Sequence, residues 1–472
     1  MIDTAISHFL QRFEEIESRR DLRNRKRRIG SELKFPLVTP DGQAADPGTT
    51  DALWEFLVEK GWDPLKDAYS GKTVGATRQG EMNEDRAACE TGFCKVEFAL
   101  AHTDTLHSLN ESIGEMKALM TEFGSMHGVA FLGFGIHPVT PPGKHLLMGK
   151  SRNLFWDRLF GGNEHISPDN GTDVHLFTIS ASSQVHIDVT VKEAVDAVNV
   201  FNGIAGAQVA MTANSNIWQG QIAHGYKCLG EMFWDWWLKD RHQGRYGVPE
   251  RKFESLEDYF RAVLEFAPVY VRRNGMPVGL PHCGTFADFY TCTDERTRCV
   301  RGDSVQGKCG LTPEGDATSV EKQLDDLDQH FTFFWHNARL SRYYTLENRI
   351  NDQQPPEEMM TVPALTLGIM ENLGEAVDLI NHYPWEFLQE ARIEAARSGL
   401  DAMIRGVPLR DLSERLLGIA DRGLRTRGLG EEIYLDPLRS RIKEQACPAD
   451  RAADIFENEG AEGLVKQMRI SC

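Results

Sequence analysis

Four short segments of the sequence carry acidic, basic or imidazole side chains at every second position. Glu32 and Lys34 stand two residues apart in RIGSELKF, and Glu97 follows in VEF. Two later segments complete the set: SSQVHIDV carries Gln184, His186 and Asp188, and YYTLENRIND carries Thr345, Glu347 and Arg349. Alternate residues of a β-strand point to the same face, so each segment would present its polar groups together. Carboxylates and an imidazole suit Mg²⁺ or Mn²⁺ held against phosphate oxygens, and arginines suit the phosphates themselves.

Each of these patterns has a simpler explanation when it is taken singly. One face of an antiparallel sheet can be exposed to water, and polar side chains then alternate along its strands without any ligand. The hypothesis of a metal and phosphate site therefore depends on the four segments sharing one sheet face.

The elements that would position these residues are strands mixed with long helices. Helical periodicity is clearest over residues 104–125 and 191–213, and the second helix ends near Asn214, Asn216 and Trp218, which could contact a substrate or cap the helix. The order lacks the regular strand–helix alternation of a doubly wound sheet, and neither a dinucleotide-binding glycine motif nor a Walker loop is present. We therefore predict an α+β fold with a mainly antiparallel sheet.

The chain reads as a single catalytic domain over residues 1–472. Residues 1–362 would form the core that bears the sheet, with an irregular insert near 291–318. Residues 363–472 are almost entirely helical in pattern, with breaks expected at four prolines: Pro384, Pro408, Pro437 and Pro448.

The charge of the chain excludes several classes of partner. Its 52 Lys and Arg residues against 70 Asp and Glu residues give a net charge of −18, which repels nucleic acid and anionic membranes. No apolar run reaches the roughly 18 residues of a transmembrane helix, and the N-terminal segment lacks a signal-peptide core. We expect a cytoplasmic protein whose nine cysteines are mostly thiols. A run of seven Lys and Arg residues within Arg19 to Arg28 predicts either a solvated helix end or an anion-binding segment.

The order of the motifs resembles the glutamate–cysteine ligase family of the plant and proteobacterial type. The resemblance runs from about residue 28 past residue 440, and its anchors are RIGSELKF, VEF with TLHSL, FLGFGIHP, SSQVHIDV, AMTANSNIWQG, YVRRNGMPV and RLSRYYTLENRIND. It implies a curved antiparallel sheet like that of glutamine synthetase. It also implies an ATP- and Mg²⁺-dependent ligase, or a Mn²⁺-dependent one, that joins glutamate to cysteine through a γ-glutamyl phosphate.

The same resemblance assigns roles to individual residues. It implies that Glu32, Glu97, His186 and Glu347 bind metal, that Arg339, Arg342 and Arg349 bind ATP, and that Gln184, Asn214, Asn216 and Trp218 contact substrate. Arg349, Arg342 and Lys34 are the residues expected to act in catalysis.

Lys34 is the main departure from the family pattern, which has a second glutamate in the first strand. A gapless alignment replaces that glutamate by Lys34, whereas a one-residue gap aligns Lys34 with a lysine that follows it; either way one metal-binding carboxylate is missing. Three readings stay open: a glutamate–cysteine ligase, a γ-glutamyl ligase for another amine, and a non-catalytic binding protein of the same fold. The partners expected are small molecules, and the sequence allows a monomer or a homodimer.

Overall fold

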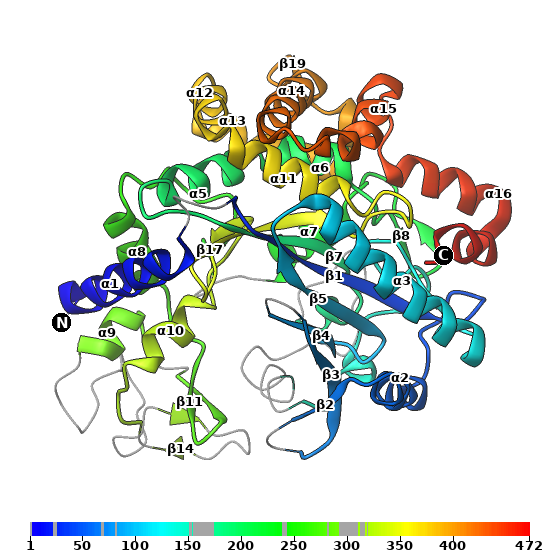
Figure 1. Ribbon diagram of the computed structural model, residues 1–472, viewed down its shortest axis with the longest axis horizontal. Helices are drawn as coiled ribbons and strands as arrows, with labels where there is room; N and C mark the ends of the chain where they lie inside the picture. The colour runs from blue at the N-terminus through cyan, green and yellow to red at the C-terminus, as the bar shows by residue number, and fades with distance from the viewer. Residues whose placement is uncertain are drawn as a thin grey trace.

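A central antiparallel sheet organises the protein (Figure 1). The computed structural model describes residues 2–21, 26–67, 70–80, 83–150, 153, 174–237, 243–280, 283–291, 310–311, 317–318 and 320–472. In spatial order the strands of this sheet are β16 (Ala338–Leu340), β17 (Thr345–Asp352), β7 (Ser182–Asp188), β1 (Ile29–Val38), β5 (Lys95–Thr103), β4 (Glu84–Cys89), β3 (Thr73–Gln79) and β2 (Asp63–Lys66). A short strand, β6 (Ala130–Phe131), pairs with the end of β1. The predicted α+β fold with an antiparallel sheet is confirmed.

The central strands form because their residues alternate between two environments. In β1, Leu33 and Phe35 are fully buried on one face, while Glu32 and Lys34 point to the other. In β5, Val96 and Phe98 are buried in the same way on either side of Glu97. Period-two alternation of this kind fixes which face a strand turns to the core.

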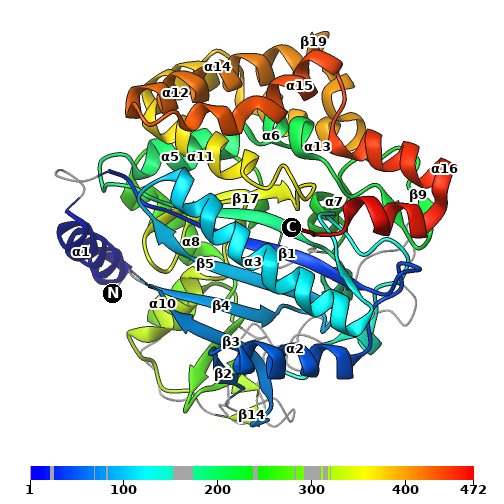
Figure 2. The same cartoon turned by 45° about the vertical axis from the view of Figure 1, so that its right-hand side comes forward.

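Helices cover the apolar face of the sheet. Two of them are α2 (Pro47–Glu59) and α3 (Leu106–His127), whereas α1 (Ile2–Arg20) packs mainly against α8 (Leu256–Glu265). Helix α3 runs across β5 and β1 in Figure 2, with Leu109, Ile113 and Met116 buried on the side that faces them. Thr105 caps its first turn by accepting a hydrogen bond from the Ser108 amide, and Gly128 ends it in the left-handed conformation.

The helix predicted over 191–213 is divided into two by the structure. These are α5 (Ala194–Gly203) and α6 (Ala205–Thr212), which contact β16 and β17. Among the described residues, the middle of the chain adds the shorter helices α7 (Leu229–Trp237), α8 (Leu256–Glu265), α9 (Phe286–Thr291) and α10 (Asp325–Phe331).

Small sheets join these middle segments. They comprise β8 (Ile217–Trp218) with β9 (Gln221–Ile222), β10 (Tyr246–Gly247) with β15 (Trp335–His336), and β11 (Tyr270–Arg273) with β12 (Met276–Gly279), β13 (Gly310–Leu311) and β14 (Ala317–Thr318). Asn274 and Gly275 turn the β11–β12 hairpin, both with positive φ, as an Asn-Gly pair favours. Most of the insert predicted near 291–318 lies outside the described residues.

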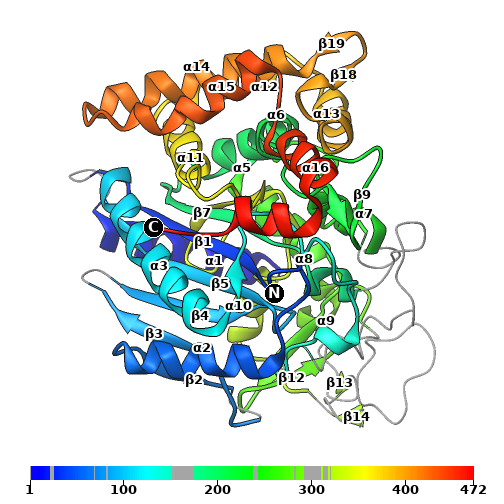
Figure 3. The same cartoon turned by 90° about the vertical axis from the view of Figure 1, so that its right-hand side faces the viewer.

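The C-terminal part is helical and gathers on one side of the molecule (Figures 1 and 3). Its elements are α11 (Thr361–Glu371), α12 (Leu373–Asn381), α13 (Trp385–Ser398), the hairpin β18 (Met403–Ile404) with β19 (Val407–Pro408), α14 (Leu409–Arg427), α15 (Asp436–Glu444) and α16 (Pro448–Met468). The four predicted breaks are confirmed, because Pro384 and Pro408 directly precede α13 and α14, and Pro437 and Pro448 lie in the first turns of α15 and α16. Within the described part of the chain, no helix combines the length and apolar character that crossing a membrane requires.

Candidate active site

The four polar segments become adjacent strands of the central sheet, in the order β17, β7, β1, β5. Their register sets three pairs of predicted site residues opposite each other: Glu32 with Gln184, Lys34 with Glu97, and Glu347 with His186. Directly opposed residues of paired strands point to the same face. The shared polar face that the sequence indicates is therefore formed, and it lines a cavity of about 1070 Å³.

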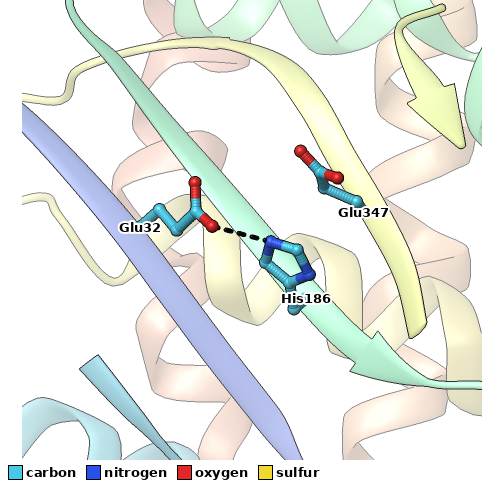
Figure 4. Close-up of side chains that lie close together, drawn as sticks. All are labelled: Glu32, His186 and Glu347. Carbon is cyan, nitrogen blue, oxygen red and sulfur yellow. Dashed lines mark hydrogen bonds and ion pairs between the residues drawn. The ribbon is translucent and has the colours of Figure 1, made fainter. Parts of the chain in front are cut away.

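Glu32, His186 and Glu347 form a trio at the centre of this face (Figure 4). One potential ligand atom from each residue lies within 4.8 Å of the other two. His186 Nε2 is 3.0 Å from Glu32 Oε1, and its Nδ1 is 3.1 Å from the Thr345 hydroxyl. Three strands thus supply two carboxylates and an imidazole at a spacing that a divalent cation could draw together.

Electrostatics keep Glu32 ionised. Burial disfavours its charged form, but Lys34 and His186 outweigh this and lower the pKa of the Glu32 carboxyl to about 2. Burial also disfavours the His186 imidazolium, yet the hydrogen bond to Glu32 and its charge raise the pKa of His186. A carboxylate that stays charged at neutral pH is the form that binds metal.

Lys34 lies between two carboxylates. Its Nζ is 2.9 Å from Glu97 Oε2 and 3.4 Å from Glu32 Oε2, and its side chain is 8% exposed. Lys34 points to the same face as Glu32. It therefore takes the place of the second glutamate of the family's first strand, as the gapless alignment has it. Glu97, predicted to bind metal with the trio, instead contacts Lys34.

Glu347 is held from its other side by two arginines. Arg339 Nε is 2.9 Å from Glu347 Oε2, and Arg349 Nη1 donates to Glu347 Oε1. Arg339 also donates to the carbonyls of Thr332 and Phe334, so most of its N–H donors are taken up by protein groups, although the residue lines the cavity. The two guanidinium groups lower the pKa of Glu347 despite its burial.

The third predicted ATP-binding residue, Arg342, lies on the exposed turn between β16 and β17. Its guanidinium is 4.6 Å from the centre of the Tyr343 ring, and both residues line the cavity. It can therefore approach a ligand from the rim of the cavity.

The predicted substrate-binding residues separate into two groups. Gln184 lines the cavity, whereas Asn214, Asn216 and Trp218 do not appear among the described residues that line it. The Asn214 amide donates to the carbonyls of Gly133 and Gln353, and the Asn216 amide donates to the carbonyl of Ala449. All three side chains are buried. These contacts favour the structural role over substrate contact.

The cavity also contains residues that the sequence did not single out. Lys95 shares the site face of β5 with Glu97, and alternation alone could have identified it. Arg20 and Arg28 come from the basic run, for which an anion-binding role is one of the two predictions; both line the cavity, although Arg28 pairs with Asp104 at 3.0 Å. Part of that run, residues 22–25, lies outside the described residues.

Aromatic side chains form another part of the cavity wall. The rings of Trp234 and Trp335 lie 5.7 Å apart, and that of Phe177 lies 4.4 Å from Trp234. These residues come from α7, β15 and the segment before β7. Only tertiary packing brings them together, so no local pattern indicated them.

Comparison with known proteins agrees with this geometry. The profile of glutamate-cysteine ligase family 2 matches residues 54–468. A chloroplastic glutamate–cysteine ligase A of Oryza sativa subsp. indica is 25% identical over 385 residues, covering 77% of this chain and 68% of the relative. The chloroplastic enzyme of Medicago truncatula is 23% identical over 424 residues, covering 85% and 73%.

A solved structure shares the fold. The glutamate–cysteine ligase of Francisella tularensis, solved in complex with AMP, aligns with a TM-score of 0.55 at 11% identity, covering 94% of this chain and 88% of that one. Because the family profile matches far more than half of the chain, this protein belongs to glutamate-cysteine ligase family 2.

Proposed function

We propose that the protein is an ATP-dependent ligase that joins the γ-carboxylate of L-glutamate to an amine, with cysteine as the default acceptor. Family membership supports the reaction class. The observation that carries the proposal is the Glu32–His186–Glu347 trio within a cavity that also holds Lys34, Lys95 and Arg349. Two anions, ATP and glutamate, must meet in this reaction, and only concentrated positive charge makes their approach favourable.

The trio fits a divalent cation, either Mg²⁺ or Mn²⁺. Its oxygen donors suit both ions, and its single imidazole suits Mn²⁺. Thr345 hydrogen bonds to one imidazole nitrogen and leaves the other directed at Glu32, an arrangement that orients metal-binding histidines. When bound, such an ion supplies charge neutralisation at the phosphate oxygens of ATP.

The protein's own residues have three tasks in the proposed reaction. Lys34 and Arg349 place fixed positive charges on the sheet face where the transferred phosphoryl group must lie. Gln184, which is 7% exposed, offers an amide to a polar group of the substrate. Glu32, His186 and Glu347 would hold the divalent cation at the centre of this face.

The aromatic wall favours a second candidate within the same reaction class. Trp234, Trp335 and Phe177 present an apolar surface that a cysteine side chain would not fill. An acceptor with a larger apolar side chain would bury more of this surface.

The cellular location, oligomeric state and partners of the enzyme are proposed from its sequence. We place it in the cytoplasm as a monomer or homodimer that acts on small molecules. The net charge of −18 opposes binding to nucleic acid.

The test is to identify the nucleotide product in the presence of glutamate and a panel of amines. Cysteine and apolar amino acids are compared at equal concentration with ATP and Mg²⁺. We expect ADP and phosphate to appear in equal amounts with a γ-glutamyl amide, and the preferred amine to give the fastest release. Release of AMP and pyrophosphate would contradict the proposal, since it would mean that glutamate is adenylated.

A further inference from the structure

We infer that the Lys34 ammonium is a built-in cation of the active site, which occupies the position between Glu32 and Glu97 and keeps a divalent ion out of it. This inference rests on the proposed metal-dependent function and adds to it the number and placement of the protein-bound ions. Glu97 is then a partner of Lys34 and not a metal ligand, contrary to the expectation from sequence.

The two oxygens of Glu32 are divided between two cation positions. Oε1 is 3.0 Å from His186 Nε2 and belongs to the trio, whereas Oε2 is 3.4 Å from Lys34 Nζ. A carboxylate that uses one oxygen on each side is the arrangement that bridges two metals in two-metal sites. Here one of the two positions already holds an ammonium group.

The backbone fixes Lys34 in this position. Lys34 lies directly opposite Glu97 in the β1–β5 pairing, and the Gln353 side chain donates to the Lys34 carbonyl at 2.9 Å. The Lys34 side chain is almost wholly buried, so its ammonium does not extend to bulk water as surface lysines do. An ammonium has no lone pair to offer a metal, and its charge repels one.

The charge balance of the cluster agrees with one protein-bound ion. Three carboxylates, those of Glu32, Glu97 and Glu347, contact three basic side chains, those of Lys34, Arg339 and Arg349. When these six groups are ionised and His186 is neutral, their charges cancel, and Glu90, which lines the same cavity, adds a further negative charge near Lys34. One divalent ion at the trio can be balanced by the phosphates of ATP, whereas a second ion beside Lys34 would add uncompensated charge in a buried site.

The experiment locates Mn²⁺ by anomalous diffraction in nucleotide-free crystals and counts bound ions by titration with Mn²⁺ alone. The wild type should show one ion, at the trio. Lys34→Ala, which removes the ammonium and leaves two facing carboxylates, should show a second ion between Glu32 and Glu97. Lys34→Arg, the matched control that keeps the charge, should show one ion. Glu97→Gln combined with Lys34→Ala should lose the added ion.

Glu97→Gln alone provides a test that does not depend on the folding of a Lys34 variant. It should lower Mn²⁺ affinity at the trio only through the lost charge, by less than the roughly tenfold that removal of a true ligand costs. An ion between Glu32 and Glu97 in the wild type, no added ion in Lys34→Ala, or a tenfold loss in Glu97→Gln would overturn the inference. Absence of an ion at the trio in every variant would instead refute the metal site of the proposed function, and the added ion in Lys34→Ala would still decide the role of Lys34.

Discussion

Two carboxylates on the same sheet face, the buried Glu347 and the half-buried Glu97, are neutralised in different ways. Arg339 and Arg349 bind Glu347 while its carboxylate still faces His186. At the other end, Lys34 stands between Glu97 and Glu32. The sequence pattern around Glu347 and around Glu97 is the same, because each is a glutamate on a β-strand. We propose that the position of the cation, beside the carboxylate or between two of them, decides whether a metal can bind.

The largest effect is expected from Glu347→Gln, which breaks the metal-binding end. Loss of the charge that would hold the ion should lower kcat by about 10²–10³-fold. The change also leaves two buried guanidinium groups without their carboxylate, so the free energy of unfolding should fall by about 3 kcal/mol. Steady-state kinetics and denaturant unfolding measure the two effects separately.

Glu390→Gln is the matched control for this prediction. Glu390 pairs with Arg405 at the exposed surface, where a lost ion pair costs at most about 1 kcal/mol. Near-normal turnover of Glu347→Gln with unaltered Mg²⁺ dependence would show that the metal lies elsewhere.

A smaller effect is expected from Lys34→Ala, which alters the other end. An anionic substrate loses a buried positive partner, and the KM for ATP or glutamate should rise by about tenfold. Lys34→Glu should be worse at low Mg²⁺ and partly rescued at high Mg²⁺, because the new carboxylate can recruit an ion. Mg²⁺ dependence of Lys34→Glu identical to that of the wild type would remove the distinction between the two ends.

Asn214→Ala tests whether the segment that follows α6, which lies outside the cavity, contributes to substrate binding. Its amide bonds to two buried carbonyls, so the variant should lose about 1–3 kcal/mol of unfolding free energy. The KM values should not change. A raised KM for glutamate or for the amine with stability unaltered would restore the substrate role that the resemblance implies.

No effect on activity is expected from mild oxidation. Cys89 lines the cavity and Cys94 lies nearby in sequence, but burial raises the pKa of the Cys94 thiol to about 12 and that of Cys89 further. Thiols that remain protonated react slowly with oxidants. A reversible fall in activity on oxidation, abolished by Cys94→Ser, would contradict this prediction.

Strand alternation predicts the shared polar sheet face that the structure forms. The alternation places Glu32, His186 and Glu347 each on a polar strand face, and the prolines mark the breaks in the helical C-terminal part. Local patterns carry this information because side-chain direction along a strand is fixed by the backbone.

The remaining features depend on contacts between distant segments. The pairing register sets Lys34 opposite Glu97, and register is determined by the whole sheet and not by either strand alone. The ion pair between Arg339 and Glu347 also depends on contacts between separate segments. The same holds for the burial of Asn214 against two backbone carbonyls. The resemblance supplied roles for these residues but could not supply their partners.

The central claim, that glutamate is activated as an acyl phosphate, is tested most directly by following its oxygen. Glutamate labelled with heavy oxygen in the γ-carboxylate is incubated with ATP, Mg²⁺ and the preferred amine, and the released phosphate is analysed by mass spectrometry. In the proposed reaction a γ-carboxylate oxygen attacks the γ-phosphorus and ADP leaves; the amine then attacks the carbonyl carbon and phosphate leaves with that oxygen. The account therefore predicts one labelled oxygen in each phosphate. Unlabelled phosphate, or label found in AMP, would contradict it.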